Sequence, residues 1–164
     1  MELEEFLNAH RNIWKTDATF WAWLRGGLRK AVWNKHPVKL TLLKKKRKKL
    51  PIGRAGRLVW AIKCACCEKW FRETEVVVDH IIPVGSLLSL DDIKQFVTRL
   101  ALVGEEDLQP LCNHHPLSCH KIKTHAERYD MTFEEAKARK IEIKNKGGSP
   151  TRKKKARRRN VKRK

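Results

Sequence analysis

Three residues with the chemistry of metal-assisted hydrolysis lie in the second half of the chain. Asp79 and His80 are adjacent in the segment Val-Asp-His-Ile-Ile-Pro, and His120 follows downstream. Asp79 offers a hard anionic oxygen, and His80 offers an imidazole, which exchanges protons near neutral pH. His120 can supply a second ligand to the same divalent ion. Because such a set leaves coordination positions open for water, it predicts a site that hydrolyses a phosphate ester.

Cysteines flank this set at spacings typical of a structural zinc site. Cys64 and Cys67 form a Cys-x-x-Cys pair, and Cys112 and Cys119 form a second pair with six residues between them. Two thiolate pairs at the two ends of a short domain are the usual arrangement for tetrahedral zinc. Because the second pair is widely spaced, the fourth zinc ligand is either Cys119 or His115, which lies at the Cys-x-x-His position relative to Cys112.

The elements that carry these residues must meet two geometric conditions. Neighbouring residues in a strand point to opposite faces, so Asp79 and His80 can share one site only where their strand ends. Pro83 fits such an end, because proline cannot continue a central ladder. On a helix, Cys119 and His120 lie about 100° apart around the axis. The cysteine can therefore face the zinc while the histidine faces the second ion.

Local patterns predict helices towards both ends of the chain and strands near its centre. Apolar residues at helical spacing follow Asp17, a candidate N-cap, and β-branched or aromatic runs at 58–63 and 75–78 indicate strands. The tryptophans of the N-terminal third are interpreted as helix-packing residues. Capping signals and apolar faces predict three further helices, which start near Ser89 (and end at Gly104), near His120 and at Thr132.

Composition points to a polyanionic partner. The 164 residues carry a formal net charge of +20, and half of that excess lies in the run 151–164. Nucleic acid is favoured over a membrane, because no stretch approaches about 18 consecutive apolar residues. The first residues lack the pattern of a secretory signal. The lysine-rich run 44–49 is either a phosphate-contacting segment or a solvated helix face.

We therefore expect an α+β protein with three parts. Residues 1–57 form an N-terminal helical arm with the basic run, residues 58–146 form the metal-stabilised domain, and residues 147–164 form a disordered basic tail. The four paired cysteines link the two ends of the central domain through zinc, which compensates for a small apolar core. Cys66 is expected to be a spare thiol.

The motifs resemble those of the HNH endonuclease family, and most of all its small members from tailed bacteriophages. The resemblance rests on Cys-x-x-Cys, on Val-Asp-His-Ile-x-Pro, on Asp-Leu-Gln-Pro-Leu-Cys from Asp107, and on Cys-His-x-x-Lys-Thr from Cys119. It covers roughly residues 60–140. It implies a ββα-metal core and hydrolysis of DNA phosphodiester bonds.

The resemblance also implies a role for each site residue. Asp79 and His120 bind the catalytic ion, and His80 activates water. Asp107 stands where the family has its middle asparagine, a residue that orients the loop by hydrogen bonds. Ionised aspartate accepts hydrogen bonds but cannot donate them. Asn113 is a second candidate for that role.

The expected cofactors are a structural Zn²⁺ and a catalytic Mg²⁺ or Mn²⁺, with Ni²⁺ or Zn²⁺ also compatible with a histidine ligand. The expected partner is DNA in the cytoplasm of a bacterial host, with no membrane and with the protein a monomer or transient dimer. Family analogy favours genome packaging beside a phage terminase over homing. The alternative from another class is a non-catalytic, zinc-stabilised protein that binds DNA or RNA.

Overall fold

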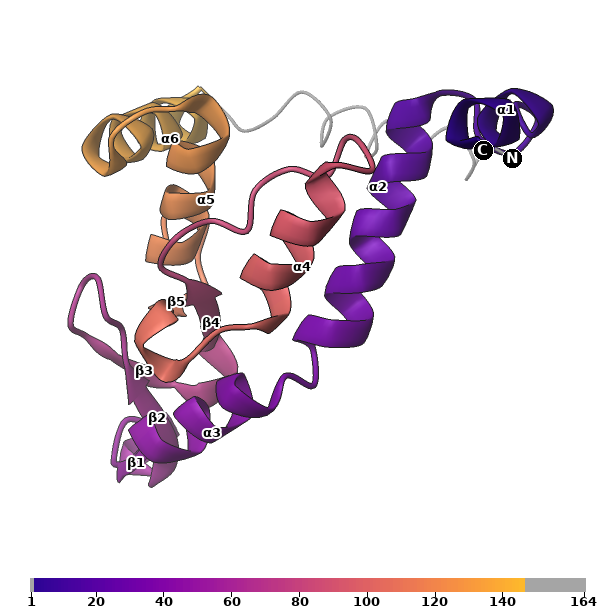
Figure 1. The fold of residues 1–164 in the computed structure, drawn as a ribbon. Helices are drawn as coiled ribbons and strands as arrows, with labels where there is room; N and C mark the ends of the chain where they lie inside the picture. Colours follow the sequence, from indigo (N-terminus) through magenta and orange to yellow (C-terminus); the bar gives the residue numbers. More distant parts are fainter. Residues whose placement is uncertain (1, 147–164) are drawn as a thin grey trace, which may run out of the picture. The chain divides into compact units, whose positions relative to one another are not determined.

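The structure, a computed structural model, describes residues 2–146. The basic tail expected over 147–164 lies outside the described residues. The chain divides into two compact units, each described by itself below. Among the described residues, the first unit combines 2–48 with Val78–Pro110, and the second combines Lys49–Val77 with 111–146. The mixture of helices and small sheets makes the fold α+β, as the sequence predicts (Figure 1).

The first unit is mainly helical. Thr16, rather than the expected Asp17, is the N-cap of the second helix, because its side chain accepts a hydrogen bond from the Thr19 amide. A five-residue π-helical turn continues that helix without a break in the helical backbone. The helices are α1 (Leu3–Ala9), α2 (Asp17–Leu28), the π-helical turn (Arg29–Trp33), α3 (Pro37–Lys46), α4 (Asp92–Ala101) and a 3₁₀ turn (Glu105–Asp107).

Two apolar clusters hold this unit together. The first packs Trp21 of α2 against Phe96 and Leu100 of α4. The second joins Leu42 of α3 to Val78 and Leu108. Trp33 packs at the edge of both clusters. Trp21 and Trp33 are therefore packing residues, as the sequence interpretation expects, whereas Trp23 is exposed.

Strands β4 (Val76–His80) and β5 (Leu108–Cys112) pair in a two-stranded sheet. Two hydrogen bonds bracket the pair: the amide of Ile81 donates to the carbonyl of Asp107, and the amide of Asn113 donates to the carbonyl of Glu75. This crossed correspondence makes the strands antiparallel. β4 ends at His80, before Pro83, and its burial alternates through Asp79 and His80.

The second unit contains a three-stranded sheet and two helices. The sheet has the order β1 (Lys48–Leu50), β2 (Val59–Lys63), β3 (Trp70–Arg72), and β2 and β3 are antiparallel with Ile62 opposite Phe71. 3₁₀ turns lie at Arg54–Gly56 and Glu73–Glu75. The helices are α5 (Cys119–Tyr129) and α6 (Phe133–Asn145).

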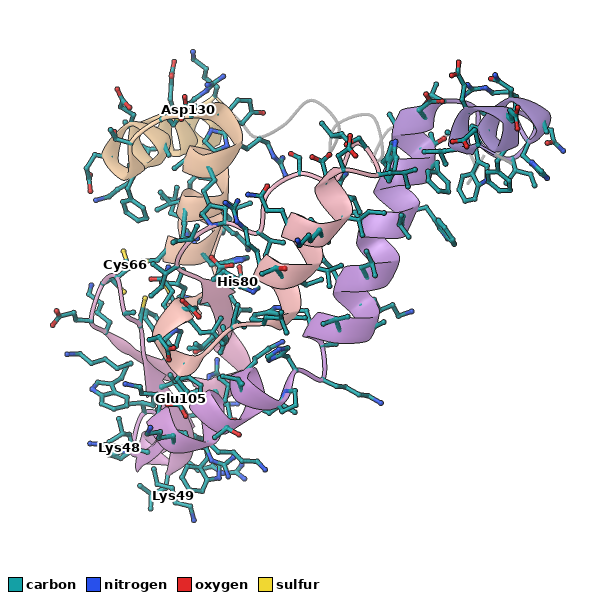
Figure 2. The ribbon with its side chains drawn as sticks, viewed as in Figure 1. Lys48, Lys49, Cys66, His80, Glu105 and Asp130 are labelled. Carbon is teal, nitrogen blue, oxygen red and sulfur yellow. The ribbon has the colours of Figure 1, made fainter. Side chains whose placement is uncertain are left out.

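α5 and α6 pack on each other through Ile122, Ala126 and Ala136. Asp130, labelled in Figure 2, ends α5 with a left-handed backbone (φ 49°), a conformation that aspartate tolerates better than most residues. Thr132 and Glu135 form the predicted capping box of α6. These two helices begin where the sequence predicts them.

Other local predictions need correction. The basic run 44–49 is neither one helix face nor one strand, because α3 ends at Lys46 and β1 begins at Lys48. α4 ends at Ala101, so Gly104 does not terminate it but precedes a 3₁₀ turn. Short strands β1, β3 and β5 were not predicted as strands. Within residues 2–146, each helix is too short or too polar to cross a bilayer.

Candidate metal centre and adjoining site

Four cysteine thiols of the second unit gather in one place. The sulfur atoms of Cys64, Cys67, Cys112 and Cys119 all lie within 4.8 Å of one another. Cys64 follows β2, Cys67 lies in the turn before β3, Cys112 ends β5 and Cys119 begins α5. Four sulfur ligands at such separations fit a tetrahedral metal ion such as zinc. The predicted ligand set is therefore brought together in full.

The backbone prepares this cluster for negative charge. The amide of Cys112 donates to the sulfur of Cys64 at 3.4 Å, and the amide of Cys119 donates to the sulfur of Cys112 at 3.3 Å. Burial raises the pKa of Cys64, but backbone amides that include those of Cys67 and Cys112 outweigh it and lower that pKa. N–H donors of this kind stabilise a thiolate.

Burial dominates at the other two interior thiols. It raises the pKa of Cys112 to about 11, and it raises the pKa of Cys119 as well, with the neighbouring thiols adding to the effect. A bare cluster therefore resists full ionisation, since like charges in one buried place repel each other. A divalent cation removes that repulsion. This balance suits a site that is completed by a metal.

The two other candidates lie outside the cluster. Cys66 is exposed at the turn that carries Cys67 (Figure 2). His115 is exposed, and its Nδ1 accepts a hydrogen bond from the amide of Leu117 at 3.2 Å. Cys119 is therefore the fourth member of the cluster, and His115 is not. Cys66 is the spare thiol that the sequence predicts.

His120, the next residue after Cys119, is not part of the thiol cluster and lines a hollow on the second unit. Its Nδ1 lies 3.3 Å from the side-chain oxygen of Asn113. An amide oxygen can only accept a hydrogen bond, so in the tautomer whose Nδ1 donates to Asn113, Nε2 keeps a lone pair. A histidine held in this way is prepared to bind a metal through Nε2.

Asp79 and His80 lie at the end of β4 in the first unit, and the π-helical turn contributes a neighbour to each of them. The Trp33 ring lies against the His80 ring with a centroid separation of 4.1 Å and an interplanar angle of 31°. Partial desolvation and Arg25 lower the pKa of Arg29, and Asp79 acts in the opposite direction. The Arg29 guanidinium therefore interacts electrostatically with the Asp79 carboxylate.

Asp107 orders the loop that pairs with the end of β4. Its carboxylate accepts a hydrogen bond from the amide of Gly104 at 2.8 Å, and its backbone carbonyl accepts one from the amide of Ile81 at 2.8 Å. Both roles need only an acceptor. The lost donor capacity that distinguishes aspartate from asparagine is not required for either contact.

Neither a protein-family model, nor a curated protein, nor a solved structure matches this chain. His120 and the cysteines belong to the second unit, and Asp79, His80 and Asp107 belong to the first.

Sequence reasoning missed two neighbours of the candidate residues. Arg29 and Trp33 reach Asp79 and His80 from a segment that looks like ordinary amphipathic helix. A π-helical turn leaves no distinctive composition, although such turns occur often at functional sites. The sequence offers Asn113 only as a substitute for Asp107, and no sequence pattern predicts its contact with His120.

Proposed function

We propose that this protein is a metal-dependent DNA endonuclease of the HNH type. The observation that carries the proposal is that two consecutive residues, Cys119 and His120, have different surroundings. Cys119 joins the thiol cluster, while His120 lines the adjoining hollow with its Nδ1 against Asn113. A structural metal would thereby fix the first turn of α5 and, with it, the direction of a histidine ligand.

The order of the elements agrees with this proposal. β4 carries Asp79 and His80, β5 pairs with it, and α5 begins with Cys119 and His120. A ββα-metal core requires two antiparallel strands followed by a helix in this order. Asp79, His80 and His120 are the proposed catalytic residues, as the resemblance of the sequence motifs implies.

Each side chain has one task in the proposed reaction. A divalent ion such as Mg²⁺ or Mn²⁺, when bound, supplies Lewis-acid stabilisation of the phosphate and of the departing oxygen. Asp79 and the Nε2 atom of His120 would hold it through an oxygen and a nitrogen. His80 takes the proton from the attacking water. Trp33 limits the rotation of the His80 ring, so that the base stays in one orientation.

The charge of the chain supports a nucleic-acid substrate. A formal net charge of +20 on 164 residues favours a polyanion, and phosphate contacts would supply most of the affinity. Binding through such contacts weakens steeply as salt rises. Asp107 does not argue against catalysis, because its observed contacts need only acceptor atoms.

A plasmid assay tests the activity. Purified protein is incubated with supercoiled DNA and Mn²⁺ or Mg²⁺, and nicked and linear products are separated on a gel. We expect nicking by the wild type, and loss of nicking in Asp79→Ala, His80→Ala and His120→Ala. His10→Ala, a histidine on the C-terminal side of α1, is the matched control and should nick as the wild type does.

The same assay distinguishes the nuclease from the rival function, a non-catalytic zinc-stabilised protein that binds nucleic acid. DNA binding without cleavage, equal in the wild type and in His80→Ala, would identify a zinc-stabilised binding protein and overturn the nuclease proposal. Circular dichroism and zinc content of each variant show that a loss of nicking does not come from unfolding. Cleavage that survives in all three variants would point to a contaminating nuclease and would equally reject the assignment.

A further inference from the structure

The hollow beside His120 is lined mainly by nitrogen-bearing side chains, most of them from α5 and α6. It has a volume of about 330 Å³ and lies wholly within the second unit. Positions 120, 121, 124, 125 and 128 repeat at helical spacing, so they form one face of α5. The lining residues that matter here are Asn113, His120, Lys121, His125, Arg128 and, from α6, Lys140.

No acidic side chain of the described residues lines this hollow. The acids of α5 and α6 are engaged with other groups: Glu127 with Lys123, Glu134 with Lys137, Glu135 with Thr132 and Glu142 with Lys146. Within the part of the chain that the structure describes, Lys121, Arg128 and Lys140 have no carboxylate partner. Three cations therefore surround one space without a counter-charge.

His125 adds a polar atom that this space leaves unsatisfied. Its Nε2 is buried and has no hydrogen-bond partner among the described residues. Its ring lies 4.6 Å from the Tyr129 ring, and the Arg139 guanidinium lies 4.9 Å from that same ring. A buried nitrogen without a partner costs free energy, and a ligand that accepts a hydrogen bond would be favoured whenever Nε2 carries a proton.

We propose that this hollow binds a phosphate group of a nucleic-acid strand through Lys121, His125, Arg128 and Lys140. The identity of the strand as a substrate rests on the proposed nuclease function, whereas the anion site itself does not. The positive charges of Lys121, Arg128 and Lys140 favour an anion. Phosphate offers several acceptor oxygens at once, which suits donors that approach from two helices.

Because His120 lines the same hollow, the bound phosphate lies close to the proposed catalytic ligand. We infer that it is a phosphate near the scissile one and that it sets where the strand is cut. Binding at this site would fix the strand before the reaction, and the residues that bind it need take no part in bond breaking.

Two binding measurements test the anion site without relying on cleavage. The first follows the full-length protein by NMR while inorganic phosphate is added, with the His125 ring signals as the reporter. The second measures duplex-DNA affinity against salt concentration with no added divalent ion. The variants are Lys121→Ala, Arg128→Ala and Lys140→Ala. Lys144→Ala is the matched control, since Lys144 is an exposed residue of α6 outside the hollow.

We expect phosphate to shift the His125 signals in the wild type and in Lys144→Ala, and to shift them less in the three hollow variants. The slope of log affinity against log salt should fall by about 0.9 for each lost phosphate contact. The control should keep the wild-type slope.

Equal slopes in all four variants, or a phosphate response that the hollow variants retain, would overturn the inference. Phosphate binding without any weakening of DNA binding would assign the hollow to a free anion, which also overturns it. Absence of nicking in the plasmid assay, together with positive results here, would reject the nuclease proposal and leave the anion site standing.

Discussion

The backbone amide of Cys112 donates a hydrogen bond to the sulfur of Cys64 at 3.4 Å across a separation of 48 residues. This contact joins the end of β5 to the turn after β2. It occurs because the chain folds the two cysteine pairs into one cluster. Structural metal sites of this kind contribute directly to folding, so their removal is destabilising.

The first prediction concerns metal content. The wild type should hold a single zinc ion per chain, and Cys64→Ser or Cys119→Ser should lose it and unfold at a lower temperature. A strong chelator should have the same effect on the wild type. Zinc is measured by a colorimetric assay after denaturation, and unfolding by circular dichroism.

Two variants serve as controls for this prediction. Cys66→Ser removes a thiol from the same turn, and His115→Ala removes the rejected ligand. Both should keep the metal, because neither side chain belongs to the four-thiol cluster. Loss of zinc from His115→Ala, with zinc retained in Cys119→Ser, would show that the assigned fourth ligand is wrong.

The sequence predicted the parts of this fold that have local signals. The Thr132 and Glu135 capping box starts α6, and the Cys-x-x-Cys spacing marks the turn after β2. The sequence could not predict β1 and β3, because strands of three residues carry too little periodicity. It could not predict β5, because Pro110 within that run argues against a strand. The neighbours of His80 were also hidden, since Trp33 reaches it from a segment more than 40 residues earlier in the chain.

The second prediction concerns Asp107. Asp107→Ala removes the acceptor for the Gly104 amide and should lower the free energy of unfolding by roughly 1–2 kcal/mol. Asp107→Asn keeps an acceptor oxygen and should lose much less. Urea denaturation of the two variants measures the difference. Equal losses in both would show that charge, and not the acceptor, matters at this position.

The third prediction concerns Trp33 as a positioning residue for His80. Trp33→Leu should remove the ring-current shift of the His80 ring protons and lower the nicking rate by roughly 10- to 100-fold, because the base loses its orientation. The loss should appear in kcat with KM almost unchanged. Trp33→Phe, which keeps an aromatic ring, should recover most of the rate.

Trp23→Leu makes the same change of side chain at a position that is 59% exposed, and it serves as the control for the loss of a tryptophan as such. It should leave both the His80 signals and the nicking rate unchanged. If Trp33→Leu changes stability alone, with the His80 signals and kcat at wild-type values, Trp33 has no positioning role.

The fourth prediction concerns Asn113 and His120. Asn113→Ala removes the oxygen next to Nδ1 of His120, and the apparent affinity for the catalytic ion should fall by roughly 10- to 100-fold, as is usual for the partner of a ligating histidine. Asn113→Asp retains an acceptor and should lose less. The measurement is the Mn²⁺ concentration that gives half-maximal nicking. Zinc content should stay constant in both variants, since Asn113 is not in the thiol cluster.

The last prediction concerns the protonation of His125. Burial first, and then the charges of Lys140, Arg139 and Arg128, lower its pKa from the ordinary value of 6.5. His120 and Lys121 line the same hollow, and Tyr129 lies against the ring. The protonated form is therefore disfavoured in the folded protein.

The lowered pKa of His125 determines how the free energy of folding depends on pH. The unfolded chain binds a proton at His125 near pH 6.5, and the folded chain binds it only at lower pH, so this group makes folding less favourable as pH falls below 6.5. An NMR titration should place the His125 pKa below 6.5 in phosphate-free buffer. Phosphate should raise it, because an anion stabilises the imidazolium, and Lys140→Ala should raise it without phosphate. A pKa that responds to neither change would mean that the cations lining the hollow do not act on this ring.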